Sequence, residues 1–191
     1  MATLERGFKS FSERTATSLR KELGVEPHAP LEAVRLAGYL GVRLLEPRQI
    51  PGLPSDVTHQ LLEVDRWGWS AVTLLLGEEI LVIYNPKKSK GRRASDVMHE
   101  LAHVVLNHEP TTLLLSQDGA VAMRTFNPKQ EDEANWLSWC LLLPREALMH
   151  ARRARLTNSQ IAEHYGVSQV LVDFRLRMSG IDLQLSRWRR R

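Results

Sequence analysis

Met98-His99-Glu100-Leu101-Ala102-His103 is the stretch that decides how this chain is organised. On an α-helix, positions i and i+4 lie on one face, so His99 and His103 offer two imidazole nitrogens to one ion. Glu100 is the next residue after His99, and its carboxylate can lie close to water bound to the same ion. Two histidines and a neighbouring carboxylate are the minimum that a hydrolytic zinc site needs. The stretch therefore predicts a metal-binding helix with Glu100 as the general base.

The residues around this motif indicate a buried helix. Ser95 or Asp96 is expected to cap its N-terminus. Apolar residues then surround the polar ones on almost every side: Val97, Met98, Leu101, Ala102, Val104, Val105 and Leu106. Such a helix is buried, and a buried glutamate between two histidines needs a partner. A metal ion is more economical than the alternative, a surface helix with two satisfied histidines.

Length and composition describe a globular chain of modest size. Its 191 residues fit one domain, with room for a small appendage. No run of 18 apolar residues suggests a membrane span, and the first residues lack the apolar core of a signal peptide. The single cysteine excludes an internal disulfide framework and fits a reducing compartment. We therefore expect a cytoplasmic protein.

The pattern along the chain predicts an α+β fold, with a small antiparallel sheet between groups of helices. A hairpin is expected from two apolar runs around a short turn. The expected strands are 42–45, 70–76 and 80–84, and a short one at 120–126 follows a turn at Asp118-Gly119. The expected helices are 4–23, 30–39, the motif helix, 131–143, 145–155 and two pieces within 156–178.

Three parts are expected along the chain. Residues 1–29 form an N-terminal helix, residues 30–155 form the core that carries the motif, and residues 156–191 form a basic helical segment packed on that core. The last quarter holds the positive charge, because residues 144–191 carry +6 within a chain of net charge +4. This charge suits nucleic acid, an acidic protein partner or a solvated surface.

A third metal ligand is expected on a second helix. Glu131 begins an acidic stretch that opens an apolar helix, 28 residues after His103. Asn135 lies at i+4 from Glu131 and so faces the same way, where it can orient a ligand from behind. Glu133 is expected to face solvent or to pair with a base. The alternative is that these acids only favour the first turn of a helix.

Two stretches resemble the ImmA/IrrE family of bacterial and phage metallo-endopeptidases. They are His99-Glu100-Leu101-Ala102-His103-Val104-Val105-Leu106-Asn107-His108 and Glu131-Asp132-Glu133-Ala134-Asn135, the latter running on to Leu142-Leu143-Pro144. The resemblance implies a zincin-like core and a zinc-dependent endopeptidase. It also implies that His99, His103 and Glu131 are the ligands and that Glu100 is the general base. Donor chemistry prefers Zn²⁺ and leaves Mn²⁺ and Fe²⁺ open.

The resemblance further suggests the kind of substrate, a helix-turn-helix repressor of the Xre type. From the geometry of zinc peptidases, we expect the strand 80–84 to be an edge strand that binds the substrate through Ile83 and Tyr84 by strand addition. A group must also stabilise the oxyanion. The sequence does not choose among six candidates: Tyr84, His108, Arg145, His150, His164 and Tyr165.

The C-terminal segment carries a second, weaker pattern. Ala162, Gly166 and Val172 lie where a helix-turn-helix needs a small residue, a turn glycine and a core residue. Several arginines could then meet DNA phosphates: Arg175, Arg177, Arg187, Arg189, Arg190 and Arg191. The alternative is a helical subdomain packed beside the cleft. Two other functions therefore stay open, a DNA-binding regulator and a toxin–antitoxin component, each with a vestigial or structural metal site.

Overall fold

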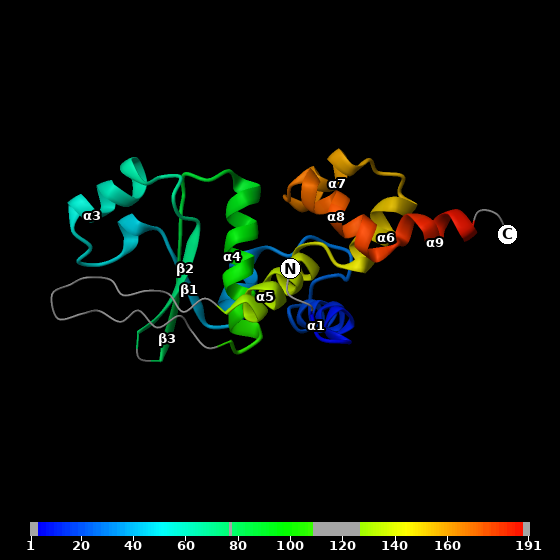
Figure 1. The fold of residues 1–191 in the computed structure, drawn as a ribbon, viewed down its shortest axis with the longest axis horizontal. Coiled ribbons are helices and arrows are strands. Elements are labelled where there is room, and N and C mark those ends of the chain that lie inside the picture. Colours follow the sequence, from blue (N-terminus) through cyan, green and yellow to red (C-terminus); the bar gives the residue numbers. More distant parts are fainter. Residues whose placement is uncertain (1–3, 77, 109–126, 189–191) are drawn as a thin grey trace.

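The computed structural model describes residues 4–76, 78–108 and 127–188, and places a small sheet beside one long helix (Figure 1). The strands are β1 Val42–Leu45, β2 Ala71–Leu76 and β3 Glu79–Tyr84. The helices are α1 Phe8–Glu22, α2 Ala33–Tyr39, α3 Ser55–His59, α4 Lys90–Val105, α5 Pro128–Leu142, α6 Arg145–Arg153, α7 Asn158–Tyr165, α8 Gln169–Ser179 and α9 Ile181–Trp188. The predicted α+β class is confirmed, and the strand and turn expected at 118–126 lie outside the described residues.

The sheet is mixed, whereas a purely antiparallel one was expected. β3 is the middle strand, with β2 antiparallel on one side and β1 parallel on the other. The hairpin of β2 and β3 is confirmed. β1 runs parallel to β3 because a long connection, containing η1 Pro47–Gln49, α3 and η2 Gln60–Val64, reverses the chain before β2. Parallel neighbours require such a crossover.

The two faces of the sheet meet different layers. Side chains alternate along a strand, so Val82 and its cross-strand neighbour Thr73 share one face. Val82 is fully buried in the main core, to which α4 contributes Leu101. Leu81 and Ile83 alternate with Val82 and so point to the opposite face, where they are also buried. Helix α3 lies on the side of the sheet away from α4 (Figure 1). The helix that carries the predicted metal-binding motif therefore covers one face of the sheet only.

The N-cap of helix α4 lies six residues before Ser95 and seven before Asp96, the two predicted caps. This N-cap is Ser89, whose side chain accepts a hydrogen bond from the backbone amide of Arg92. A β-carbon added at Gly91 would lie 3.2 Å from the carbonyl oxygen of Gly166, so this first turn packs closely on the turn between α7 and α8. The helix ends at Val105, and Asn107 takes the left-handed conformation with φ of 51°. That conformation turns the chain back over the last turn of α4.

The C-terminal helices pack on the core through α8. The ring of Phe174 lies 4.6 Å from that of Trp139 on α5, measured between centroids. Arg175 is 1% exposed. Its Nε donates to the carbonyl oxygen of Leu143 at 3.0 Å, and its Nη2 lies 2.5 Å from Oε1 of Glu13 on α1. One buried arginine thus joins α1, α5 and α8.

The packing of Arg175 corrects one expectation. A side chain that is buried against α1 and α5 cannot reach a DNA phosphate, so the role predicted for Arg175 is wrong. Arg177, two residues later, is exposed. Arg189, Arg190 and Arg191 lie outside the described residues. The division into three parts stays a prediction, although residues of α1, α4, α5, α7 and α9 share one hydrophobic core cluster.

Candidate metal and catalytic site

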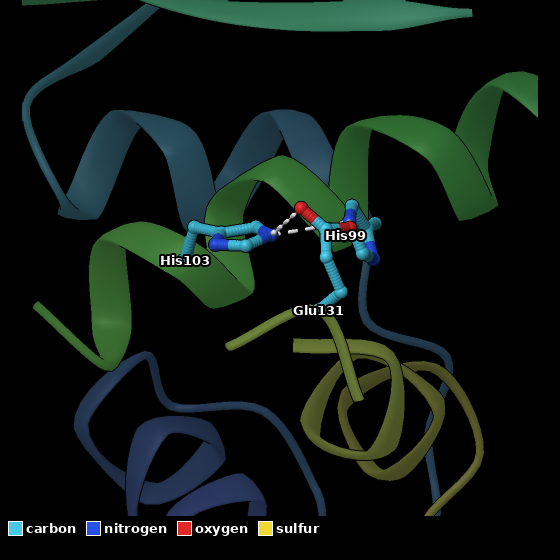
Figure 2. Close-up of side chains that lie close together, drawn as sticks. All are labelled: His99, His103 and Glu131. Carbon is cyan, nitrogen blue, oxygen red and sulfur yellow. Dashed lines mark hydrogen bonds and ion pairs between the residues drawn. The ribbon is translucent and has the colours of Figure 1, made fainter. Parts of the chain in front are cut away.

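Three predicted metal ligands converge on one point (Figure 2). His99 and His103 lie one turn apart on α4, and Glu131 comes from the first turn of α5. Nε2 of His99 lies 3.2 Å from Oε2 of Glu131, and Nε2 of His103 lies 3.8 Å from Oε1. The two Nε2 atoms are 3.1 Å apart. One ligand atom from each residue lies within 4.8 Å of the other two.

This donor set fits a catalytic zinc ion. Zinc binds imidazole nitrogen and carboxylate oxygen at about 2.0–2.2 Å, so its tetrahedral ligands lie roughly 3.3 Å from one another. The separations between His99, His103 and Glu131 surround that value. Three protein ligands leave a fourth position open, as hydrolytic sites require. The cluster is half-buried, which makes it accessible while partly shielding its charge.

Glu100 lies in the same place and is held from the sheet. Its side chain is on the cleft side of α4, and the residue is only 6% exposed. Oγ1 of Thr73 donates to Oε2 of Glu100 at 2.6 Å. One carboxylate oxygen is therefore fixed by β2, and the other is left for a proton. Sequence reasoning missed Thr73, although it is the one polar residue in the apolar run of β2.

A second feature that sequence reasoning missed lies behind His103. Nδ1 of His103 is 3.0 Å from Nδ1 of His108, and Nε2 of His108 is 3.3 Å from Oε2 of Glu133. His108 reaches this place because Asn107 turns the chain back, and the amide of His108 bonds to the carbonyl of His103 at 3.0 Å. We name the pair of His108 and Glu133 the outer pair.

The outer pair defines which nitrogen of each ring carries a proton. If Nε2 of His103 binds metal, its Nδ1 carries hydrogen and donates to Nδ1 of His108. His108 must then be neutral and donate from Nε2 to Glu133. Burial lowers the pKa of His108, and Glu133 opposes that change by favouring the charged ring. Glu133 thus pairs with a base, one of the two outcomes expected for it.

Glu133→Gln is expected to weaken metal binding by about 10-fold, since carboxylates behind a ligating histidine orient it and raise its basicity. Zinc affinity measured by competition with a chromophoric chelator tests this. Asp132→Asn is the matched control, because it removes the same charge from the same turn of α5. Asn135→Ala tests the role that the sequence assigned to Asn135. Equal affinities for Glu133→Gln and Asp132→Asn would remove the outer pair from the metal site.

A cleft of about 610 Å³ opens onto the ligands and Glu100. One wall is the loop and strand from Trp67 to Ala71, and the others are faces of α4 and α5. Its lining residues are Trp67, Gly68, Trp69, Ser70, Ala71, Arg92, Ser95, Asp96, His99, Glu100, Glu131, Asn135, Ser138 and Trp139. Asn135 therefore lies beside the site, and its role in orienting a ligand stays a prediction.

The expected substrate-binding strand is in the wrong position. β3 is paired on both sides, so no substrate strand can add to Ile83 or Tyr84. Ile83 also faces away from α4. The hydroxyl of Tyr84 donates to Oε1 of Glu46 at 3.1 Å, and burial is the main cause that raises its pKa. The expectation came from the geometry of zinc peptidases, and the sequence of this chain does not reveal the order of its strands.

None of the six oxyanion candidates is among the described residues that line the cleft. His108 lies behind His103, as described above. Arg145 donates to the carbonyl of Ser179 and to the side chain of Gln184. The ring of His150 stacks on His28, with centroids 4.0 Å apart. The remaining contacts are those of Tyr165, whose hydroxyl donates to the carbonyl of His28, and of His164, whose ring packs on Tyr165.

The chain is similar in fold to one of the solved protein structures. No curated protein sequence matches the chain. A solved structure described as a Mycobacterium tuberculosis transcriptional regulator matches with a TM-score of 0.52 at 16% sequence identity. The match covers 91% of this chain and 47% of the other, so the chain spans about half the length of that protein. At this identity the likeness shows the fold alone.

Among the described residues, none of the helices has the length and hydrophobicity of a membrane span.

The profile of the IrrE N-terminal-like domain (Peptidase_M78) matches residues 71–177. The match begins at β2, which carries Thr73, and it includes all of α4 and α5 with the three clustered ligands. It covers more than half of the chain, which therefore belongs to the IrrE N-terminal-like domain family, a family of metallopeptidases.

Proposed function

We propose that this chain is a zinc-dependent endopeptidase that hydrolyses one bond in a regulatory protein. The observation that carries the proposal is the position of Glu100. Its carboxylate is buried and accepts a hydrogen bond from Thr73 at 2.6 Å. Glu100 also lines the cleft onto which the convergent ligands His99, His103 and Glu131 open. A structural metal site would need the ligands but would not need a buried carboxylate aimed into an open cleft.

The residues divide the work of peptide hydrolysis. A zinc ion held by the three ligands would supply a Lewis acid and lower the pKa of water towards neutrality. Glu100 accepts a proton from the attacking water through the oxygen that Thr73 leaves free. It then passes that proton to the nitrogen of the leaving amine. Thr73 keeps the carboxylate oriented through both transfers.

Strand β2 offers the surface for an extended substrate. It is an edge strand of the described sheet, and its own residue Thr73 contacts Glu100. A substrate that adds to β2 is held by backbone hydrogen bonds and passes the ligands. This assigns to β2 the role that the sequence had given to β3.

Family membership supports a helix-turn-helix repressor of the Xre type as the substrate. The proposed reaction takes place in the cytoplasm. Metal-free protein, zinc-loaded protein and protein loaded with Mn²⁺ or Fe²⁺ can each be incubated with purified Xre-type repressors. Intact-mass spectrometry would then locate the cleaved bond. We expect cleavage at one bond, lost with a chelator and restored by zinc. Repressors that stay intact in every metal form would contradict the proposal.

DNA binding through α8 is less well supported. The face of α8 that holds Phe174 and Arg175 packs on the core. The exposed side includes Val170, Asp173 and Arg177, and of these three only the arginine suits a phosphate backbone. A measured affinity for duplex DNA that falls steeply as the salt concentration rises would instead support the alternative function, a DNA-binding regulator.

A further inference from the structure

Tryptophans form part of the wall of the catalytic cleft. The chain has five tryptophans, and three of them, Trp67, Trp69 and Trp139, line this cleft. Trp67 is 64% exposed, an unusual position for so large an apolar side chain. Trp67 and Trp69 come from the loop before β2, whereas Trp139 comes from α5. Two segments far apart in sequence therefore supply aromatic walls to the same space.

The loop that carries two of these walls is rigidly supported. Asn85 is fully buried, and its Nδ2 donates to the carbonyl oxygens of Arg66 at 2.8 Å and Trp69 at 3.1 Å. Nε1 of Trp69 donates to the carbonyl of Leu61 at 2.9 Å. The buried amide of Asn85 thus fixes the backbone at both ends of a short loop, and the bond to Leu61 holds the indole of Trp69 before any ligand arrives. Preformed walls lower the entropic cost of binding.

The third wall is equally fixed. Trp139 packs edge to face against Phe174 and against Trp136, with centroids 4.6 and 6.0 Å away. Nζ of Lys88 bonds to the carbonyl of Trp67 and lies 5.4 Å from its ring centroid. This cation supports the loop but leaves the indole of Trp67 mostly exposed.

Two of the charged lining groups neutralise each other. Arg92 and Asp96, both at the cleft, form an ion pair at 2.9 Å. Ser95 and Ser138 are neutral and polar, and the remaining ionisable groups of the lining are His99, Glu100 and Glu131 of the metal and catalytic site. Aromatic walls beside the polar groups of a site are typical of a place for an apolar ligand group.

We propose that Trp67, Trp69 and Trp139 form a substrate subsite that accepts a large apolar side chain, of the size of leucine or phenylalanine, near the scissile bond. We name it the tryptophan subsite. The inference rests on the proposed peptidase function, because the subsite shares its cleft with Glu100 and the metal ligands. It narrows the substrate class to proteins that present a bulky apolar residue beside the cut.

Peptide hydroxamates test the subsite without the natural substrate, because the hydroxamate group binds zinc directly. Each compound carries a benzyl side chain on the first, second or third residue counted from the hydroxamate group. It is compared with the compound that has a methyl side chain at the same position. Binding to the zinc-loaded protein is measured by calorimetry. At one position we expect the benzyl compound to bind about 10-fold more tightly. Trp67→Ala should reduce that preference to about 2-fold, and Trp67→Phe should restore most of it.

Tyr39→Ala is the control, since it removes another exposed aromatic side chain from α2, outside the cleft. It should leave the preference unchanged. Equal binding of benzyl and methyl compounds at all three positions, or an unchanged preference in Trp67→Ala, overturns the subsite while the metal site stands. Failure of every hydroxamate to bind zinc-loaded protein overturns the proposed metallopeptidase together with the subsite.

Discussion

Glu100→Gln is expected to lower kcat for the cognate substrate by about 10³-fold, within the range of a lost general base. The substitution keeps the size of the side chain, and the amide oxygen can still accept the hydrogen bond from Thr73. The ligand atoms of His99, His103 and Glu131 are untouched. Metal content should therefore stay at the wild-type level, as measured by elemental analysis of the purified variant.

Two further measurements make this result specific. Glu163→Gln removes an exposed carboxylate on α7 and should cleave at the wild-type rate. The KM of Glu100→Gln should change little, because Glu100 acts on the proton and not on the bound peptide. A Glu100→Gln protein that retains zinc and still cuts at the normal rate would show that another group is the base.

Arg175→Ala is expected to lower the free energy of unfolding by about 3 kcal/mol, a large part of the ~5–15 kcal/mol that is usual for a domain. The substitution leaves the carbonyl of Leu143 without its donor and removes the partner of Glu13 from a buried position. Glu13 keeps one contact, to the backbone amide of Arg145, so its loss is partial. Urea unfolding measures the change.

Arg177→Ala is the matched control for Arg175. It removes an arginine from the same helix, two residues later, where the side chain is exposed. Its stability should stay within about 0.5 kcal/mol of the wild type. If Arg175→Ala unfolded at the wild-type urea concentration and instead lost affinity for DNA, α8 would be a recognition helix and the packing described for it would be wrong.

The sequence was most informative where a local pattern decides the chemistry. The spacing of His99 and His103 fixes a common face on any helix, and Glu131 was found because an acid opened the next apolar helix. The hairpin of β2 and β3 followed from two apolar runs with a short turn. These features depend on residues close in sequence, so local periodicity is enough to predict them.

Features that depend on contacts between distant segments were missed or wrong. Strand order placed β3 in the middle, which removed the role expected for Ile83 and Tyr84. Arg175 looked like a phosphate contact until its packing on Glu13 and Leu143 was known. A basic residue reads the same in sequence whether it faces solvent or a buried carbonyl.

The sequence by itself was enough to predict the metal-binding helix, its general base and the third ligand, because helical spacing, residue chemistry and the family resemblance all indicate them. Only the tertiary structure decided what supports those groups: Thr73 on Glu100, the outer pair of His108 and Glu133 behind His103, and the tryptophan subsite. Thr73 and Glu100 are 27 residues apart, and His108 and Glu133 are 25 apart. Such pairs meet only when β2, α4 and α5 pack together, since burial of their apolar faces, and not any local pattern, sets those distances.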